Sequence, residues 1–180
     1  MSPMLAYVNA EDFRLFDRVL AFRPPRLVRL WVLWATRLGD GWLQVVTGLV
    51  LLSLGSEYQR TFAACAVATG IANLAMVVLK RRFRRKRPCE YAAHPLYDVK
   101  PLGYVPSDHF SFPSGHSMNA FAVGTVIALQ FPWLAPLALF LAVSVAASRV
   151  LLGLHFVSDV LVGAALGTSI GLSVFLALLG

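Results

Sequence analysis

The chain has 180 residues, of which 58% are hydrophobic and only 14% charged, and its mean hydropathy is +0.68. A soluble domain of this length carries roughly a quarter of its residues as charged side chains, so the composition excludes an ordinary water-soluble domain as well as a disordered chain. We therefore expect one all-α, membrane-embedded domain over residues 1–180, with room for about five or six spans of roughly 20 residues each.

The net charge of +7 is concentrated in one place, because seven of the 16 basic residues lie between Lys80 and Arg87. The apolar sequence on either side makes anionic lipid headgroups or a phosphate substrate better partners for this run than nucleic acid. Cys65 lies in an apolar run and Cys89 in a polar loop, so we expect no disulfide between them.

The first predicted element is an amphipathic helix within residues 9–25, with Asn9 as its N-cap and Pro24-Pro25 as its stop. Its apolar face carries Phe13 and Phe16, and charged residues occupy the opposite face. We expect an interfacial helix that lies on the membrane, and packing against the bundle is the alternative.

Apolar helices are predicted along the rest of the chain. Residues 27–38 form a short apolar stretch that either spans the membrane or is half-buried in it, and the turn Gly39-Asp40-Gly41 separates it from an apolar helix at 42–54. Four further apolar segments predict membrane spans, at residues 61–79, 115–131, 133–152 and 157–179.

These four spans bring one set of helix ends to the same face of the membrane. Helices joined by tight turns run antiparallel, so the ends near residues 80, 115, 152 and 157 emerge together. The longest connection, residues 89–112, also lies on that face, and its aromatic residues suit a cap at the level of the lipid headgroups.

The first polar cluster at this face is the run from Lys80 to Pro88. A positively charged anchor that sets topology or holds anionic lipids accounts for its charge. It does not account for Asn73, which lies two turns before Lys80 on the same side of the helix. Polar groups within a span usually face the bundle interior, so Asn73 indicates a polar seam that leads to this end.

The second cluster is the sequence Phe112-Pro113-Ser114-Gly115-His116-Ser117. Ser114 is a predicted N-cap, Gly115 lets the backbone approach a ligand, and the amides at a helix N-terminus favour an anion. A plain helix cap explains this segment without any function. His116 adds a functional argument, because a bound anion would stabilise its cationic form, which suits a general acid.

The third cluster contains Arg149, His155 and Asp159. Arg149 lies in an otherwise apolar helix, where a charge is costly unless an anion meets it. His155 and Asp159 are spaced i to i+4, so a helix that begins at or before His155 would bring the carboxylate within reach of the ring. The carboxylate would fix the tautomer and leave Nε2 free as a nucleophile, and a purely structural His–Asp pair is the alternative.

Together the clusters offer two histidines, one aspartate and several cations, without residues at metal-ligand spacing. This set predicts phosphoryl transfer with no metal and no cofactor. Cations would neutralise the phosphate oxygens, one histidine would attack phosphorus, and the other would protonate the leaving oxygen.

The order and spacing of these residues resemble a known signature. Its three parts, Lys80-x6-Arg87-Pro88, Pro113-Ser114-Gly115-His116 and Ser148-Arg149-x5-His155-x3-Asp159, look like those of the type 2 phosphatidic acid phosphatase superfamily at every signature position. The resemblance covers residues 80–159. It implies a bundle of about six helices and metal-independent hydrolysis of a phosphate ester or diphosphate through a phosphohistidine.

The resemblance also implies a role for each signature residue. His155 would be the nucleophile, Asp159 would orient it, and His116 would be the acid for the leaving group. The remaining residues would bind the phosphate: Lys80, Arg87, Ser114, the Gly115 amide and Arg149.

The leading hypothesis is a phosphatase for a membrane lipid. Candidate substrates are polyprenyl diphosphate, phosphatidylglycerol phosphate, phosphatidic acid and lipid A phosphate, and the compactness of the chain favours polyprenyl diphosphate. A vanadium haloperoxidase has a similar anion pocket within the superfamily, but the apolar spans argue against it. The third hypothesis is a non-enzymatic scaffold that binds anionic lipids through residues 80–87.

Two indications of membrane orientation conflict. The resemblance implies a bacterial cytoplasmic (inner) membrane with the site on the extracytoplasmic face. The positive-inside tendency predicts the opposite for a face with seven basic residues. We expect the outward orientation, with the N-terminal arginines on the other side if 27–38 spans.

Overall fold

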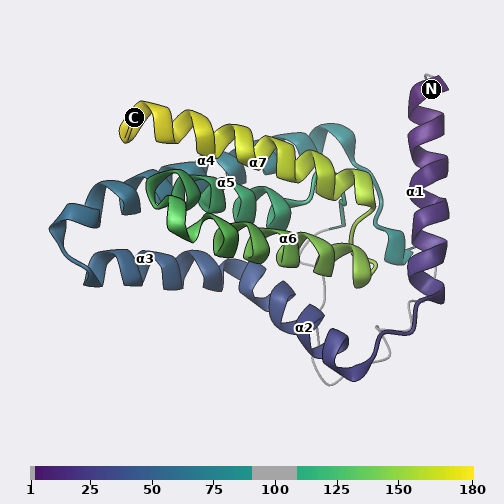
Figure 1. Cartoon of the computed structure of the whole chain (residues 1–180). Helices are drawn as coiled ribbons and strands as arrows, with labels where there is room; N and C mark the ends of the chain where they lie inside the picture. The colour runs from purple at the N-terminus through teal and green to yellow at the C-terminus, as the bar shows by residue number, and fades with distance from the viewer. Residues whose placement is uncertain (1–2, 91–108) are drawn as a thin grey trace.

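The computed structural model describes residues 3–90 and 109–180, which form a bundle of α-helices with a separate helix at its N-terminal end (Figure 1). This confirms the predicted all-α class. The predicted aromatic cap falls mainly on residues 91–108, outside the described residues.

Helix α1, Pro3–Ala21, lies across one end of the bundle rather than along it (Figure 1). It ends before the two prolines, as predicted, but begins six residues before Asn9, so the prediction of Asn9 as the N-cap is wrong. Proline fits the first turn of a helix, which allows the earlier start. Phe13 and Phe16 pack edge-on against Phe156, with ring centroids 5.1 and 6.1 Å away. The helix therefore also packs on the bundle.

Helices α2, Arg26–Arg37, and α3, Leu43–Ser53, are joined by a π-helical segment, Leu38–Trp42. The turn predicted at residues 39–41 is a kink in an almost continuous helical path. Gly41 makes it possible, since its φ of 105° is a conformation that favours glycine. The kink places Asp40 at a cavity, which it lines while remaining partly exposed.

The four predicted spans correspond to helices α4, Gln59–Phe83, α5, Gly115–Gln130, α6, Ala135–Leu151, and α7, Val157–Leu178. In the described part of the chain, three helical segments are long and apolar enough to cross a membrane: 59–83, 132–151 and 157–178. At 16 residues, α5 is about 24 Å long, somewhat less than a hydrocarbon core of about 30 Å. It packs against α4, α6 and α7.

Small residues hold α7 close to α5. A Cβ atom on Gly163 would lie 2.6 Å from the carbonyl oxygen of Ser114 and 3.3 Å from Cβ of Ser117, so only glycine permits this approach. Gly167 and Gly171 continue the contact one and two turns further along α7. Close approach through small residues is typical of helices packed within a membrane. The contact brings the first turn of α7 against the first turn of α5.

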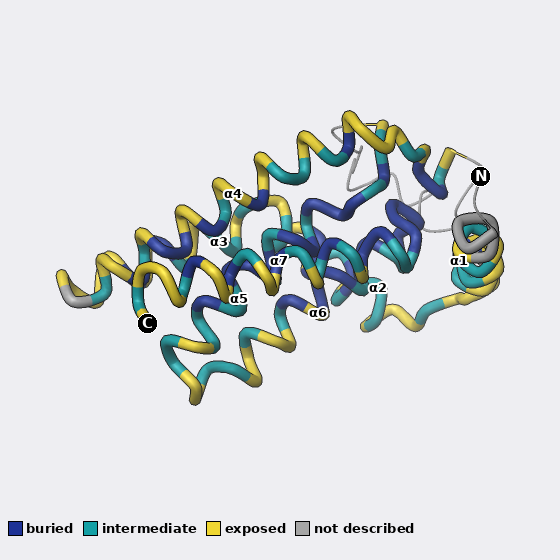
Figure 2. Tube along the Cα trace, turned by 90° about the horizontal axis from the view of Figure 1, so that it is seen from above, coloured by how far each residue is buried: buried dark blue, intermediate teal, exposed yellow. Residues whose placement is uncertain are grey.

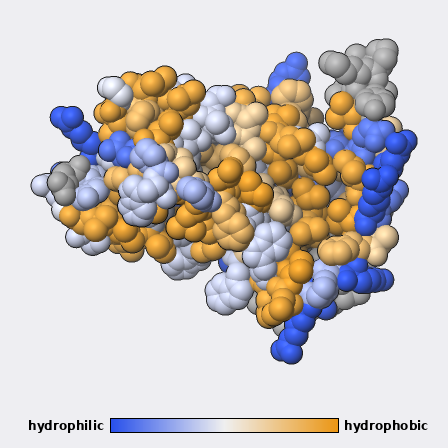
Figure 3. All heavy atoms as spheres, in the orientation of Figure 1, coloured by the Kyte–Doolittle hydropathy of each residue, from blue (hydrophilic) through white to orange (hydrophobic). Residues whose placement is uncertain are grey.

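The outer surface of the bundle is apolar, as Figure 3 shows for one face. Large aliphatic side chains such as Leu74, Leu139 and Leu161 are 59–68% exposed. Figure 2 shows the buried residues on the inward sides of the helices and in the connections at one end. An apolar exterior around buried charged groups is the distribution expected of an integral membrane protein.

Candidate active site

A cavity of about 560 Å³ lies where α4 ends and α5 begins. Six of the eight predicted site residues line it: Lys80, Arg87, Gly115, His116, Arg149 and His155. Both predicted catalytic histidines therefore face the same space. Ser114 and Asp159 are fully buried and do not line the cavity, and each contacts a segment that does.

Three buried cations surround this cavity. Lys80 lies in the last turns of α4, and the chain then reverses at Arg84, which takes a left-handed conformation with φ of 49°. This reversal brings Arg87 back against the connection before α7, where its Nη1 donates to the carbonyl oxygen of Leu154 at 2.9 Å. Arg149 arrives from the last turn of α6. Buried charges of one sign favour an anionic ligand between them.

Arg149 is held by Thr36, which is not among the predicted site residues. Its Nη1 donates to Oγ1 of Thr36 in α2 at 2.5 Å, and both side chains are almost fully buried. The sequence offers one signal, a hydroxyl within an apolar stretch. The contact joins α2 to α6 at the cavity.

His155 lies before helix α7, which begins at Val157 as the predicted span does, so the pair does not have the geometry of two residues within one helix. Its Nδ1 is 3.7 Å from Oδ2 of Asp159, which is longer than a hydrogen bond. That oxygen accepts the backbone N–H of Phe156 at 2.9 Å, because Asp159 caps the first turn of α7. The carboxylate still faces the ring, as the i to i+4 spacing predicts.

The opposite ring nitrogen of His155 faces Arg87. Nε2 lies 3.0 Å from Nη1 of Arg87. A guanidinium only donates, so Nε2 accepts this bond and the proton of the neutral ring is on Nδ1, towards Asp159. Burial lowers the pKa of His155 well below 6.5, and the nearby charges of Arg87, Arg149 and Lys80 lower it further. The structure therefore presents a neutral imidazole with its lone pair on Nε2.

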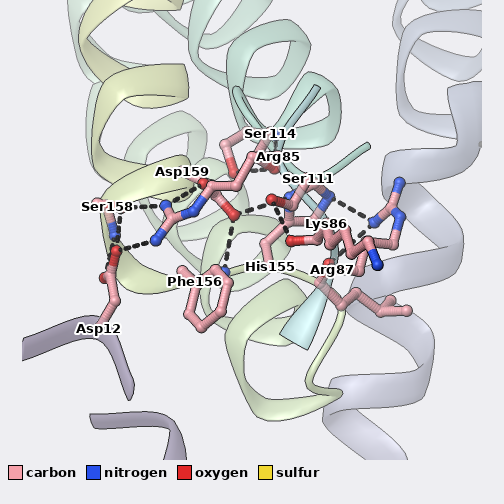
Figure 4. A network of polar contacts seen from close by, with 12 residues as sticks. Asp12, Arg85, Lys86, Arg87, Ser111, Ser114, His155, Phe156, Ser158 and Asp159 are labelled. Carbon is pink, nitrogen blue, oxygen red and sulfur yellow. Dashed lines mark hydrogen bonds and ion pairs between the residues drawn. The ribbon is translucent and has the colours of Figure 1, made fainter. Parts of the chain in front are cut away.

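Arg85 connects Asp159 to the N-terminal helix (Figure 4). Its Nη1 donates to Oδ1 of Asp159 at 2.7 Å and to Oγ of Ser158 at 2.8 Å. Its Nη2 donates to Oδ2 of Asp12 at 2.7 Å and to Oδ1 of Asn9 at 3.1 Å. In the sequence Arg85 is one member of a basic run. In the structure it fixes the carboxylate behind His155.

Asp12 completes this connection from α1. Its Oδ1 accepts the backbone N–H of Ser158 at 3.1 Å, and Oδ2 accepts the Ser158 hydroxyl. Helix α1 therefore lies at the same end of the bundle as the cavity. The exposed Arg14 and Arg18 of α1 lie at that end too. Their placement on the other side depended on a span at 27–38, and α2 is not among the described helices long and apolar enough to cross a membrane.

His116 contacts Asp40, a residue of the turn predicted at residues 39–41. Its Nε2 lies 2.7 Å from Oδ1 of Asp40. A carboxylate only accepts, so Nε2 carries a proton. The kink at residues 38–42 supplies this partner, and Gly39 within it packs directly on the imidazole.

The first turn of α5 is ordered as the sequence predicts. Oγ of Ser114 accepts the backbone N–H of Ser117 at 3.4 Å, and the Ser117 hydroxyl donates to the same atom at 2.9 Å. The N–H of Ser114 donates to the carbonyl oxygen of Asp159 at 3.0 Å. Gly115 packs against Met76 of α4 and also lines the cavity. The cap thus ties α5 to α7.

No metal centre is built from the described residues, since among them no three His, Cys, Asp or Glu side chains are grouped to hold an ion. Cys65 and Cys89 are not joined by a disulfide, as expected. The predicted site residues that line the cavity present guanidinium, ammonium and imidazole groups, which bind anions. The arrangement is suited to hold a phosphate between two imidazoles, one with a lone pair on Nε2 and one with a proton on Nε2.

The fold and this arrangement define a membrane phosphatase class, and comparison with known proteins identifies the family. The profile of the PAP2 superfamily matches residues 61–179. The chain belongs to this superfamily, as the signature predicted.

Individual relatives are phosphatases of lipids. Phosphatidylglycerophosphatase B of Bacillus subtilis is 43% identical over 109 residues, which cover 54% of this chain and 48% of that protein, so the chain spans about half the length of this relative. A decaprenylphosphoryl-5-phosphoribose phosphatase of Mycobacterium tuberculosis is 34% identical over 127 residues, 68% of this chain and 67% of that protein.

A solved structure shows the same fold. A transmembrane PAP2 type phosphatidylglycerolphosphate phosphatase from Bacillus subtilis superposes with a TM-score of 0.71 at 30% identity, over 93% of this chain and 84% of that chain. The architecture described above is therefore that of a membrane PAP2 phosphatase.

Proposed function

We propose that this protein is a metal-independent lipid phosphatase that hydrolyses a phosphate monoester or diphosphate of a membrane lipid through a phosphohistidine. The observation that carries the proposal is the cavity in which a neutral imidazole with a free lone pair, a second imidazole with a proton on Nε2, and three buried cations face one another. The named relatives act on phosphatidylglycerol phosphate and decaprenylphosphoryl-5-phosphoribose, which supports a lipid phosphate as the substrate.

In this proposal the phosphate binds between Lys80, Arg87 and Arg149, with the Gly115 amide at the N-terminus of α5 as a further donor. The cations neutralise the oxygens on which charge develops in the transition state. Ser114, which is buried and bonded to Ser117, orders the helix end that presents this amide.

The reaction has two steps. Nε2 of His155 attacks phosphorus with its lone pair, the bond from phosphorus to the leaving oxygen breaks, and His116 gives that oxygen a proton. Water then attacks the phosphohistidine while the now neutral His116 accepts its proton, and inorganic phosphate leaves. Asp159 stabilises the positive charge that His155 gains, and Arg85 keeps Asp159 in place.

The proposal is tested by detecting the phosphohistidine intermediate. Purified protein in detergent with EDTA should release phosphate from a short-chain lipid phosphate. Rapid denaturation during turnover of a ³²P-labelled substrate should trap a label that is stable to alkali and lost in acid.

The matched variants for this experiment are His155→Ala and His109→Ala. His109 is an exposed histidine outside the cavity, so its variant should keep both turnover and label. Undiminished release by His155→Ala, or release that needs a chelatable metal, would refute the proposed chemistry.

We infer a cytoplasmic (inner) membrane of a bacterium as the location, with the cavity on the extracytoplasmic face. The basic run and α1 both lie at the cavity end, so positive-inside charge predicts the opposite orientation. Three of the seven basic residues of that run, Lys80, Arg85 and Arg87, are buried or paired in the site, so their charge serves the site rather than topology.

The orientation is tested with one cysteine. In a chain that also carries Cys65→Ala and Cys89→Ala, an Arg84→Cys variant places the thiol at an exposed position on the cavity end. A membrane-impermeant maleimide should label it in intact cells. Labelling that requires lysis would place the cavity in the cytoplasm and leave the proposed chemistry unaffected.

A further inference from the structure

The cavity has a second half that carries no cation. Beyond His116 it is lined by Asp40, Gln44, Asn73 and Asn119, whose side chains are acidic or neutral and polar. Asn119 lies one turn after His116 on α5, and its Nδ2 donates to Oδ1 of Asn73 on α4 at 2.8 Å. Asn73 belongs to the polar seam predicted from the sequence, but phosphate binding does not use it.

Two amide groups in this half have unused hydrogen-bonding capacity. Within the described part of the chain, Oε1 of Gln44 and Oδ1 of Asn119 are shielded from solvent and have no hydrogen-bond partner. A buried polar atom without a partner is unfavourable, so these atoms are suited to a ligand that brings its own donors.

The geometry of the proposed reaction directs the leaving group towards this half of the cavity. In-line displacement places the attacking nitrogen and the leaving oxygen on opposite sides of phosphorus. The leaving oxygen is therefore next to His116, and the group that it belongs to extends into the space between Asp40, Gln44 and Asn119.

We propose that this half of the cavity binds hydroxyl groups of the leaving alcohol, so that the protein prefers lipid phosphates in which a hydroxyl-bearing carbon adjoins the phosphate ester. This inference rests on the proposed function and names its substrate class. A hydroxyl donates to an amide or carboxylate oxygen and accepts from an amide N–H, which matches all the groups present.

The same groups disfavour a second phosphate. The leaving group of a lipid diphosphate is itself a phosphate, which would bring its charge beside the Asp40 carboxylate. Like charges that lie close together repel. The cavity thus ranks hydroxylated monoesters above polyprenyl diphosphate, which the compactness of the chain had favoured.

A separate apolar groove of about 580 Å³ is lined by other residues of the same two helices, α3 and α5. It is lined by Leu43, Thr47, Ala120 and Val123, the sequence neighbours and next turns of Gln44 and Asn119 on α3 and α5. The cavity and the groove together follow the order of a lipid phosphate: charged phosphate, polar linker, apolar chain. We assign the groove to the substrate's own hydrocarbon chain.

The experiment compares two short-chain lipids that differ in one hydroxyl, phosphatidylglycerol phosphate and its analogue in which propane-1,3-diol replaces the terminal glycerol. The wild type should show a kcat/KM about tenfold or more higher for the hydroxylated lipid, because the analogue leaves buried amides without partners. Asn119→Ala and Gln44→Leu should each reduce this ratio to within about threefold of unity.

The ratio of the two kcat/KM values is independent of how much of each variant is folded. Ser169→Ala is the control, since its hydroxyl bonds to its own helix at Ala165, and it should keep the wild-type ratio. Equal kcat/KM values in the wild type, or a ratio that both variants leave unchanged, would overturn the inference. In either case hydrolysis that depends on His155 leaves the proposed function standing, whereas no hydrolysis of either lipid overturns both.

Discussion

The two histidines of the cavity lie in unlike surroundings. The side chain of His155 is 1% exposed and lies between Arg87 and Asp159, whereas that of His116 is 22% exposed and bonds to Asp40. Three separate segments of the chain fix His155, while His116 depends on one turn of α5 and the kink between α2 and α3. This contrast fits the proposed roles, in which His155 is a fixed attacking group and His116 an acid that the leaving oxygen can reach.

The largest expected effect is the difference between the two histidine variants when the leaving group of the substrate is changed. His155→Ala should lower kcat roughly 10³-fold or more on every substrate, because it removes the nucleophile. His116→Ala should lower kcat about 10²- to 10⁴-fold on a lipid phosphate, whose alkoxide must be protonated.

The discriminating substrate is an aryl phosphate, whose leaving group departs without a proton. On it, His116→Ala should lose less than about tenfold, and His155→Ala should stay inactive. Equal losses for the two variants on both substrates would remove the distinction between attacking group and acid.

The next effect concerns the support of His155. Arg85→Ala leaves the carboxylate of Asp159 buried without its cation, and we expect kcat to fall about 10- to 100-fold with KM little changed, together with a lower unfolding temperature. Arg85→Lys should recover part of kcat, since it restores a charge but not the paired geometry.

The matched control for Arg85 is its neighbour Arg84, which is exposed and contacts the backbone of its own helix. Arg84→Ala should change kcat less than about twofold. Equal effects at both positions would mean that Arg85 contributes general positive charge rather than the contact with Asp159.

A smaller effect is expected on the support of His116. Asp40→Asn keeps the shape of the side chain but removes the charge that holds the protonated nitrogen, and we expect kcat on a lipid phosphate to fall about three- to tenfold. The same variant should leave hydrolysis of an aryl phosphate almost unchanged. A loss of the same size on both substrates would assign Asp40 to binding or folding instead.

The smallest effect is in the pH profile. The lowered pKa of His155 keeps its imidazole neutral at pH values below 6.5. The fall of kcat/KM on the acid side, corrected for ionisation of the substrate, should therefore lie below that pH. An unshifted group of pKa 6.5 would be about three-quarters protonated at pH 6.0 and would lose about that share of kcat/KM. Arg87→Gln removes a cation that lowers this pKa, so the limb should move to higher pH.

Much of the fold follows directly from the sequence. The bounds of α5 and α7 agree with the predicted spans 115–131 and 157–179 to within one residue, because long apolar runs with turn residues at their ends are local signals. The start of α1 was missed because Asn9, a residue that often caps helices, lies within the helix instead. The kink at Gly41 was predicted only as a break between two helices, because the sequence around a glycine does not specify the direction of the helix that follows.

The sequence by itself determined the chemistry of the site. The spacing of Lys80, Arg87, His116, Arg149, His155 and Asp159 within and beside helices is local, and antiparallel packing of spans is enough to bring these residues to one face. The tertiary structure alone decided their partners. The pairs Arg149–Thr36, His116–Asp40 and Arg85–Asp12 are 113, 76 and 73 residues apart in the chain. Such contacts depend on how helices cross and kink, which no short-range pattern encodes.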